Sequence, residues 1–496
     1  MPRFLLATQA GFRTAFLNNA LISTTRSHRS FPTVCIISCS VRAHLPRGFS
    51  KNRKLWIRHP TVVNDPYHVA RFFWNNGARF LTTLSMSKPF LFPAHSRRWL
   101  RRSVFVSHLI LAITVLATAG VAAQEARSGD PQSESNESPE EAAVARVVNG
   151  IMRPYLAQRQ RTGARGQRWI RSSDLGAIVA VSLHGRRYFF AYGKATDAGT
   201  PFTRDTLLEI GSCTKVFTTT LFALTINRNQ IVPDAFAQKY MPSGFTLRAQ
   251  QLTPLELADF TSGMPDDPTN LPRGLEQQSI DSYTVKDFLT WASNYEPATR
   301  LPAPYKYSNA GIGLLSYLIA TATGKSWEDQ VSSEIFQPLG MPDTTLRPTP
   351  EQERRLAQGH NRAGQNAPRW PVYAWYAAGG LRSTAHDMIS FGEANLGHQE
   401  VNGKPVPPDL ITAMQLAQKP IYTIPKGVNK QAMAWMINMG AGNPNLHPVI
   451  VKNGGTSGFG SVIAINPSKD AAIFIGMNQV GAQPAAKGIE ILRQLP

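Results

Sequence analysis

The sequence is poor in cysteine and lacks the common metal and phosphate motifs. It contains only three cysteines, Cys35, Cys39 and Cys213, and the first two lie in a segment that we exclude from the fold below. The single remaining thiol excludes an internal disulfide, even in an oxidising compartment. No Cys-x-x-Cys, His-Glu-x-x-His or Gly-x-x-x-x-Gly-Lys motif occurs. We therefore expect no metal site, no phosphate-binding loop and no cofactor.

Acidic residues are nearly absent from the first 123 residues, which contain 17 Lys and Arg but only one carboxylate, Asp65. The remainder carries 35 of the 52 basic and 31 of the 32 acidic residues, so the formal net charge of +20 belongs mainly to the N-terminal segment. The main body has no basic run interleaved with aromatic residues. This distribution argues against a nucleic-acid partner.

The chain also lacks a clean apolar run of the roughly 20 residues that a membrane span needs. Residues 86–123 combine a cationic start, a short apolar run and small residues ending at Ala123. This pattern is typical of a signal peptide, so we predict cleavage after Ala123 and a periplasmic or secreted protein with no membrane span. An uncleaved anchor is the alternative.

Three further segments follow from composition. Residues 1–85 are Arg-rich without helix or strand periodicity, and we interpret them as an over-extended start, with a transit peptide as the alternative. Residues 124–141 are polar and rich in Ser and Glu, which predicts a disordered linker. The catalytic domain is then predicted to span residues 142–496.

The fold class is predicted to be α/β, with one antiparallel sheet built from both ends of the domain. Two strand-like runs meet at His184-Gly185, and two more turn between Asn466 and Asp470. A last helix is predicted from about Pro484 to Leu492, and residues 212–400 are mostly helical in pattern. We therefore expect helices on the faces of the sheet, an inserted helical lobe, and a ligand cleft where the two meet.

A serine and a lysine three positions apart, Ser212 and Lys215, stand in the stretch "EIGSCTKVF". The apolar residues that follow predict a helix beginning near Ser212, which places both side chains on one face. A buried lysine loses proton affinity, and a neutral amine could accept the serine proton. The alternative is an ordinary helix cap, and the same spacing recurs at Ser85 to Lys88.

The neighbouring Cys213 is an alternative nucleophile that we reject. The next position on a helix points away by about 100°. A free cysteine is also most often an inert packing residue.

Two more motifs favour a reaction centre. Tyr307-Ser308-Asn309 is the only Tyr-x-Asn in the chain and begins an apolar helix that Gly324 would end. Lys452-Asn453-Gly454 is the only Lys-x-Gly and lies on a strand beside the C-terminal hairpin. Each motif alone fits an ordinary packing or surface residue, but their order and placement argue against coincidence.

With these motifs the sequence resembles the serine β-lactamase and penicillin-binding (D,D-peptidase) superfamily, and its class C β-lactamase branch in particular. "LADFTSGMPDDP", "FQPLGMPDTTL", "AGGLRSTAHDM" and "AMQLAQKP" support the resemblance, which covers about residues 145–495. It implies that Ser212 forms an acyl-enzyme while Lys215 and Tyr307 share proton transfer. An unperturbed tyrosine pKa of about 10 makes a poor base, so either nearby cations lower it or Lys215 acts first.

The resemblance also implies roles for the residues around this centre. Asn309 would hydrogen-bond Lys215 or the substrate amide, and Lys452 would attract a substrate carboxylate. The backbone N–H groups of Ser212 and Gly455 would form the oxyanion hole. The implied substrate-binding residues are Asn453, Gly454, Thr456 and Asn294.

Three positions depart from the family pattern. Asn453 stands where the family usually has Thr or Ser. In "ASNYEP", Ser293 stands where we match a family Gln. Gly379 replaces an aromatic residue, with Tyr376 close by.

The resemblance implies a serine hydrolase that opens the β-lactam ring of antibiotics without metal or cofactor. The partner would be a small β-lactam or a D-Ala-D-Ala-type substrate, and we expect a monomer. The alternatives are a D,D-carboxypeptidase, an esterase of the same superfamily, or a non-hydrolytic penicillin-binding module.

Overall fold

The computed structural model describes residues 138–161, 176–272 and 282–496, together with four short strands nearer the N-terminus. The chain divides into two units, Met1–Ser133 and Glu134–Pro496. In the first unit, the strands form two antiparallel pairs within a segment that we expected to lack strand periodicity: β1 (Phe4–Leu5) with β2 (Phe16–Leu17), and β3 (Cys39–His44) with β4 (Arg79–Leu84). The predicted signal peptide and nearly all of the linker lie outside the described residues.

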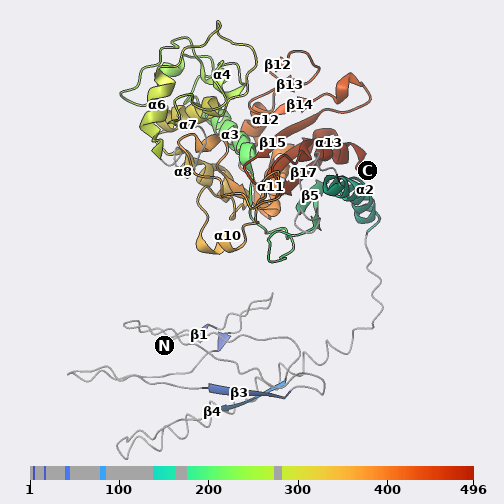
Figure 1. Ribbon diagram of the computed structural model, residues 1–496. Helices are drawn as coiled ribbons and strands as arrows, with labels where there is room; N and C mark the ends of the chain where they lie inside the picture. Colours follow the sequence, from blue (N-terminus) through green and yellow to red (C-terminus); the bar gives the residue numbers. More distant parts are fainter. Residues whose placement is uncertain are drawn as a thin grey trace, which may run out of the picture. The chain divides into compact units, whose positions relative to one another are not determined.

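The second unit contains an eight-stranded antiparallel sheet with the strand order β12-β13-β14-β15-β16-β17-β5-β6 (Figure 1). Strands from both ends of the domain meet in it, because β17 pairs with β5. The predicted α/β class with an antiparallel sheet is confirmed. The strands are β5 (Ala177–Leu183), β6 (Arg186–Tyr192), β12 (Tyr422–Thr423), β13 (Lys430–Gln431), β14 (Met436–Asn438), β15 (Val449–Gly455), β16 (Gly460–Asn466) and β17 (Ala471–Met477).

Both predicted hairpins form, and left-handed backbone conformations close them. His184 and Gly185, with φ of 51° and 77°, make the two-residue turn between β5 and β6. This geometry matches the right-handed twist of paired strands. The second hairpin turns through a short 3-10 segment, Pro467–Lys469, and ends at Asp470 with φ of 45°.

Each face of the sheet is covered by helices. Along β5, Val179 and Val181 point to one apolar cluster, while Ile178 and Ala180 point to the other. This is the two-residue alternation of a strand that is buried on both faces. Helices α2 (Pro139–Arg161) and α13 (Pro484–Gln494) pack together on the first face, and α11 (Ala385–Leu396) covers the second.

The region between β6 and β12 is mostly helical, as predicted. Its described residues include the short strand pairs β7 (Leu208–Glu209) with β9 (Arg382–Ser383) and β10 (Glu400–Val401) with β11 (Lys404–Pro405). Its α-helices, besides α11, are α3 (Thr214–Asn227), α4 (Pro254–Ala258), α6 (Val285–Ser293), α7 (Asn309–Thr323), α8 (Trp327–Val331), α9 (Gln337–Leu339), α10 (Pro350–Arg354) and α12 (Pro408–Ala417).

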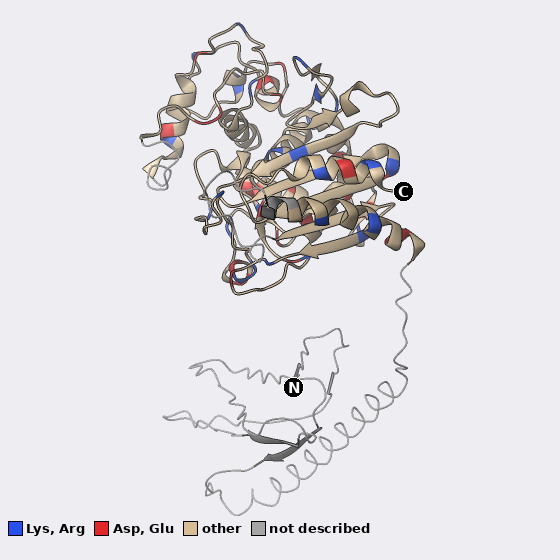
Figure 2. Ribbon diagram, turned by 45° about the vertical axis from the view of Figure 1, so that its right-hand side comes forward, with Lys and Arg blue, Asp and Glu red and all other residues tan. Residues whose placement is uncertain are grey.

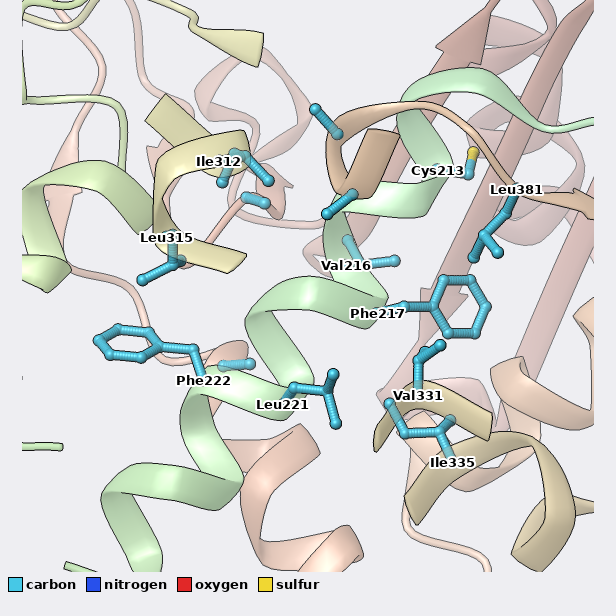
Figure 3. Packing of buried hydrophobic residues seen from close by; sticks show 14 of the residues in the cluster. Cys213, Val216, Phe217, Leu221, Phe222, Ile312, Leu315, Val331, Ile335 and Leu381 are labelled. Atoms are coloured by element: carbon cyan, nitrogen blue, oxygen red, sulfur yellow. The ribbon is translucent and has the colours of Figure 1, made fainter. Parts of the chain in front are cut away.

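Helix α3 runs through the middle of this region and is enclosed on all sides (Figure 3). Twelve of its 14 residues are buried, and Phe217 stacks on Phe391 with ring centroids 4.0 Å apart. A helix that is closely packed on every face has little freedom to move, so α3 is a rigid support for the residues at its N-terminus.

The surface of this unit carries charges of both signs. Basic and acidic positions are interspersed along its ribbon (Figure 2). Among the described residues, no helix combines the length and apolar character needed to cross a bilayer.

Candidate active site

Ser212 lies on a 3-10 turn, Gly211–Cys213, immediately before α3. The predicted helix therefore begins two residues later than expected, at Thr214. Gly211 has φ of 48°, and a Cβ there would stand only 2.5 Å from the Gly455 carbonyl oxygen. Glycine is required at this position, because it lets the serine turn approach the end of β15.

Lys215 is fully buried and points to the Ser212 hydroxyl. Its Nζ lies 3.0 Å from Ser212 Oγ, 2.6 Å from Asn309 Oδ1 and 2.7 Å from the Ala378 carbonyl oxygen. The Asn309 and Ala378 oxygens can only accept hydrogen bonds. A neutral amine with two N–H groups would satisfy both of them, and its lone pair would then face the serine O–H.

The environment of Lys215 favours that neutral form. Burial lowers the pKa of Lys215 well below its ordinary value, and the charge of Lys452 lowers it further. The carboxylates of Asp266 and Asp267 oppose this shift. Desolvation dominates because the side chain has no contact with water.

Tyr307 lies between the two lysines. Its hydroxyl hydrogen-bonds Ser212 and lies 3.5 Å from Lys452 Nζ. The Nζ atoms of Lys215 and Lys452 are 4.8 and 4.7 Å from the centroid of the tyrosine ring. Phe260 packs against the same ring at 4.9 Å. The phenol is thus held within reach of the nucleophile and of a second proton carrier.

Burial raises the pKa of Tyr307 well above its ordinary value, and its hydrogen bond with Ser212 opposes this shift. Burial also lowers the pKa of Lys452 to about 8. Of the two possibilities left open by the sequence, these directions favour Lys215 as the first base, with Tyr307 as a protonated phenol.

Strand β15 supplies the third motif. Lys452 is buried and Asn453 is exposed, as strand alternation requires. A Cβ on Gly454 would stand 2.0 Å from the Ile210 carbonyl oxygen, so this glycine allows the strand to pack on the serine turn. Gly455 ends the strand beside Gly211, with space around its Cα.

Two of the expected substrate-binding residues lie elsewhere. Thr456 is only 6% exposed, and its hydroxyl donates to Glu209 Oε2 at 2.7 Å, so it supports the turn from inside. Asn294 caps the C-terminus of α6, where its amide donates to the Thr290 carbonyl oxygen at 2.8 Å. Both side chains are engaged in these structural hydrogen bonds, to Thr290 and to Glu209.

The other departures from the family pattern also have structural settings. Ser293 is buried, and its carbonyl oxygen accepts from the Arg248 N–H. A Cβ on Gly379 would stand 2.6 Å from the Tyr373 hydroxyl, so the tyrosine occupies the space that a side chain would need. Tyr376 packs instead on Trp327, with ring centroids 5.6 Å apart.

Several groups at the site escaped prediction. The Ala378 carbonyl oxygen gives no sequence signal, because every residue has one. Glu209, three residues before Ser212, is buried and accepts from the Trp370 N–H at 2.6 Å. Asp267 accepts from Asn309 Nδ2 at 3.2 Å. Its stretch supported the resemblance, but only the fold reveals its contact with Asn309.

Within the part of the chain that the structure describes, no cluster of three or more His, Cys, Asp or Glu side chains is arranged to hold a metal ion.

A family model described as Beta-lactamase matches residues 148–495. The chain belongs to the Beta-lactamase family. One curated relative is the "Beta-lactamase" of Escherichia coli (strain K12), which is 29% identical over 337 residues, covering 62% of this chain and 85% of that protein. Another is the "D-alanyl-D-alanine-carboxypeptidase/endopeptidase AmpH" of the same strain, 26% identical over 314 residues, covering 61% and 79%.

Solved structures of this family share the fold. "A class C beta-lactamase" aligns with a TM-score of 0.61 at 22% sequence identity, covering 74% of this chain and 99% of that one. The "Crystal structure of class C beta lactamase from Rhodobacter sphaeroides" aligns with a TM-score of 0.58 at 25% identity, covering 71% and 98%. The class C branch suggested by the sequence is thus the branch of these structural neighbours.

Proposed function

We propose that this protein is a serine hydrolase that opens the β-lactam ring through an acyl-enzyme on Ser212. The observation that carries the proposal is the arrangement of Lys215, whose amine has two fixed acceptors in Ala378 and Asn309 and lies 3.0 Å from the serine oxygen. Family membership and the class C neighbours support the same reaction.

In the first step, Ser212 Oγ attacks the lactam carbonyl carbon and its proton passes to the Lys215 lone pair. The carbonyl oxygen becomes an oxyanion, which the backbone N–H groups of Ser212 and Gly455 would stabilise. Preorganised donors of this kind act where negative charge develops, so they lower the barrier without uniform substrate binding.

In the second step, the tetrahedral intermediate collapses and the C–N bond breaks. The leaving nitrogen takes a proton from the Tyr307 hydroxyl. The proton held by Lys215 Nζ, which lies 4.8 Å from the centroid of the tyrosine ring, then returns to the Tyr307 oxygen without passing through Ser212, whose oxygen is now bonded to carbon and carries no proton. The product is a serine ester and an opened ring, with no net loss or gain of protons.

In the third step, water hydrolyses the ester. A water molecule gives a proton to the Lys215 and Tyr307 pair while its oxygen attacks the ester carbonyl. The Ser212 oxygen leaves with a proton, and the free enzyme is restored. Lys452, cationic below its pKa of about 8, would hold a substrate carboxylate during these steps.

Hydrolysis of D-Ala-D-Ala peptides is the second candidate function. The similarity to the E. coli carboxypeptidase/endopeptidase favours it. The two activities share acylation and differ in the leaving group and in the speed of deacylation. An esterase and a non-hydrolytic penicillin-binding module share the same serine chemistry. We further propose export to the periplasm or the medium, and action as a monomer.

The test is a steady-state comparison of a chromogenic cephalosporin, a D-Ala-D-Ala peptide and a short acyl ester with the purified protein. Many turnovers of the cephalosporin support the lactamase. Turnover of the peptide together with a stable β-lactam adduct would identify a carboxypeptidase. A single burst without turnover of any substrate would identify a binding module, and turnover of the ester alone would identify an esterase.

A further inference from the structure

Asp267 lies next to the cluster but has no part in the reaction described above. One of its carboxylate oxygens, Oδ1, accepts from Asn309 Nδ2 at 3.2 Å and from Trp375 Nε1 at 2.9 Å. Asn309 in turn contacts Lys215 through its own oxygen at 2.6 Å. A continuous chain of hydrogen bonds therefore joins Trp375, Asp267, Asn309 and Lys215.

The partners of Asn309 determine the orientation of its amide. A carboxylate accepts hydrogen bonds only, so the nitrogen of the amide must face Asp267. The oxygen must then face Lys215, whose amine donates to it. If Asp267 were replaced by a group that can also donate, the amide could turn over and present N–H groups to the Lys215 amine.

Asp267 is itself held by a fixed donor. The Trp375 side chain is buried, and its ring packs 4.6 Å from the ring of Tyr373. A Cβ on Gly313 would stand 2.4 Å from Trp375 Cβ, so α7 and this tryptophan are in close contact. Three residues later, the Ala378 carbonyl oxygen accepts from Lys215. The segment from Trp375 to Ala378 thus holds both Asp267 and Lys215.

The loop that carries Asp267 also fixes the start of α7. The backbone N–H groups of Asn309 and Ala310 both donate to the Asp266 carbonyl oxygen, at 2.8 and 2.9 Å. The Ser308 hydroxyl donates to the Pro265 carbonyl oxygen at 2.6 Å and accepts from the Gly311 N–H at 2.8 Å. The backbone of Asn309 is therefore fixed independently, which leaves the rotation of its amide to Asp267.

We propose that Asp267 is a positioning residue for acylation, which locks the Asn309 amide so that its oxygen holds the Lys215 amine against Ser212. This inference rests on the proposed acyl-enzyme function. It assigns a role to a carboxylate that the motifs do not include.

The electrostatics of the site support this role. Burial raises the pKa of Asp267, while the hydrogen bond from Asn309 lowers it. The groups that act on Lys215 are Lys452, Asp266, Asp267 and Cys213. The carboxylate of Asp267 raises the pKa of Lys215, so its removal lowers that pKa further. The pH dependence of acylation then moves in a known direction, toward lower pH.

Asp266 provides a matched control. Its side chain is exposed, and its carboxylate also raises the pKa of Lys215, but only the Asp267 carboxylate of the two accepts a hydrogen bond from the Asn309 side chain. Asp266→Asn therefore removes a nearby charge without disturbing the amide. Asp267→Asn removes the charge and the constraint on the amide together.

The experiment measures the single-turnover acylation rate of a fluorescent penicillin by the wild type, Asp267→Asn, Asp266→Asn, Asn309→Ala and the Asp267→Asn/Asn309→Ala double variant, over a series of pH values. Loss of a charge-assisted hydrogen bond lowers the pH-independent rate of Asp267→Asn roughly 10- to 100-fold. Asp266→Asn stays within about twofold, since exposed charges contribute little. Both single Asp variants move the acid limb of the pH–acylation-rate profile to lower pH, because each removes a carboxylate that raises the pKa of Lys215.

The double variant decides whether Asp267 acts through Asn309. If it does, the acylation rates of Asn309→Ala and of the double variant agree within about twofold, because Asp267→Asn can no longer change the orientation of an amide that is absent. The proposal is overturned if the rate loss of the double variant equals the product of the losses in Asp267→Asn and Asn309→Ala. An Asp267→Asn rate within about twofold of the wild type, or an equal loss in Asp266→Asn, also overturns it.

Folding is checked by the melting temperature of each variant. If Asp267→Asn does not fold, Trp375→Phe replaces it, because that change removes the indole donor to Asp267 and keeps a ring in the core. An unchanged acylation rate in folded Trp375→Phe then overturns the proposal. If β-lactams do not acylate the wild type, the proposed function fails. The same comparison with a p-nitrophenyl ester then still tests Asp267.

Discussion

Lys215 Nζ lies 3.0 Å from Ser212 Oγ and also contacts the acceptor oxygens of Asn309 and Ala378. Ser212 lies on the 3-10 turn that leads directly into α3, and Lys215 lies in the first turn of α3, so local geometry sets the distance between them. The two acceptors come from distant segments and fix the direction of the amine. The result is a desolvated lysine held against a hydroxyl, an arrangement in which the neutral amine can activate a serine without a histidine.

Lys215→Arg tests whether proton transfer, and not charge, is the role of this lysine. Arginine keeps the positive charge but does not deprotonate in proteins. We expect acylation to fall by a factor of roughly 10² to 10⁴, the usual contribution of a general base. Lys215→Met should show a similar loss. Stopped-flow acylation checks this, and a Lys215→Arg rate within tenfold of the wild type would show that charge alone is enough.

The pH dependence of kcat/KM tests the role of Lys452. Burial lowers its pKa to about 8, with Cys213 and Asp266 acting in the opposite direction, and Tyr307 and Lys215 lie beside it. The cation that would bind a substrate carboxylate is present below this pH and is lost above it. We expect kcat/KM for a carboxylate-bearing β-lactam to fall above pH of about 8. A neutral ester of similar size should show no such fall. Identical profiles for the two substrates would remove Lys452 from carboxylate binding.

Asn453→Thr tests the departure in the third motif. Asn453 is exposed on β15, directly after Lys452, so its side chain can change without disturbing the core. A threonine hydroxyl is smaller and can donate to a carboxylate. We expect a several-fold lower KM for carboxylate-bearing β-lactams, roughly the value of one hydrogen bond. No change in KM, or an increase, would mean that Asn453 suits the natural substrate of this enzyme.

Gly454→Ala and Gly455→Ala form a matched pair for the packing of β15 on the serine turn. A Cβ at Gly454 would stand 2.0 Å from the Ile210 carbonyl oxygen, whereas at Gly455 the nearest atom, the Phe459 carbonyl oxygen, is 3.7 Å away. We expect Gly454→Ala to reduce the free energy of unfolding by about 1–3 kcal/mol or more, as overpacking does. Gly455→Ala should stay within about 0.5 kcal/mol. Urea unfolding measures both, and equal stabilities would contradict the close packing.

The sheet and helix α7 were predictable because their signals come from residues that lie close together in the sequence. The hairpin at His184-Gly185 combines alternating apolar residues with a turn that favours left-handed backbone, and α7 ends at Gly324 as expected. The short strands β12, β13 and β14 were not predicted. Their two or three residues are too few to show a period, and each depends on a tertiary neighbour: β14 pairs with the edge of β15, β13 with β14, and β12 with β13.

The reacting groups were predictable from motifs, but the groups that hold them were not. Ser212 and Lys215 share one turn, so their contact follows from sequence spacing. Asp267 reaches Asn309 only because the loop before it binds the start of α7. For Asn294, the expectation rested on similarity to a family stretch, and the structure engages its amide with its own helix. Such contacts depend on tertiary packing, which no local pattern encodes.

The most direct test of the central claim is mass spectrometry of the protein after brief exposure to a penicillin, run with the wild type and with Ser212→Ala. The account predicts a mass increase of one penicillin on the peptide that contains Ser212, and its loss over time as the drug is hydrolysed. Ser212→Ala should stay folded and show neither the adduct nor turnover. Hydrolysis that persists in Ser212→Ala, or an adduct on another residue, would contradict the account.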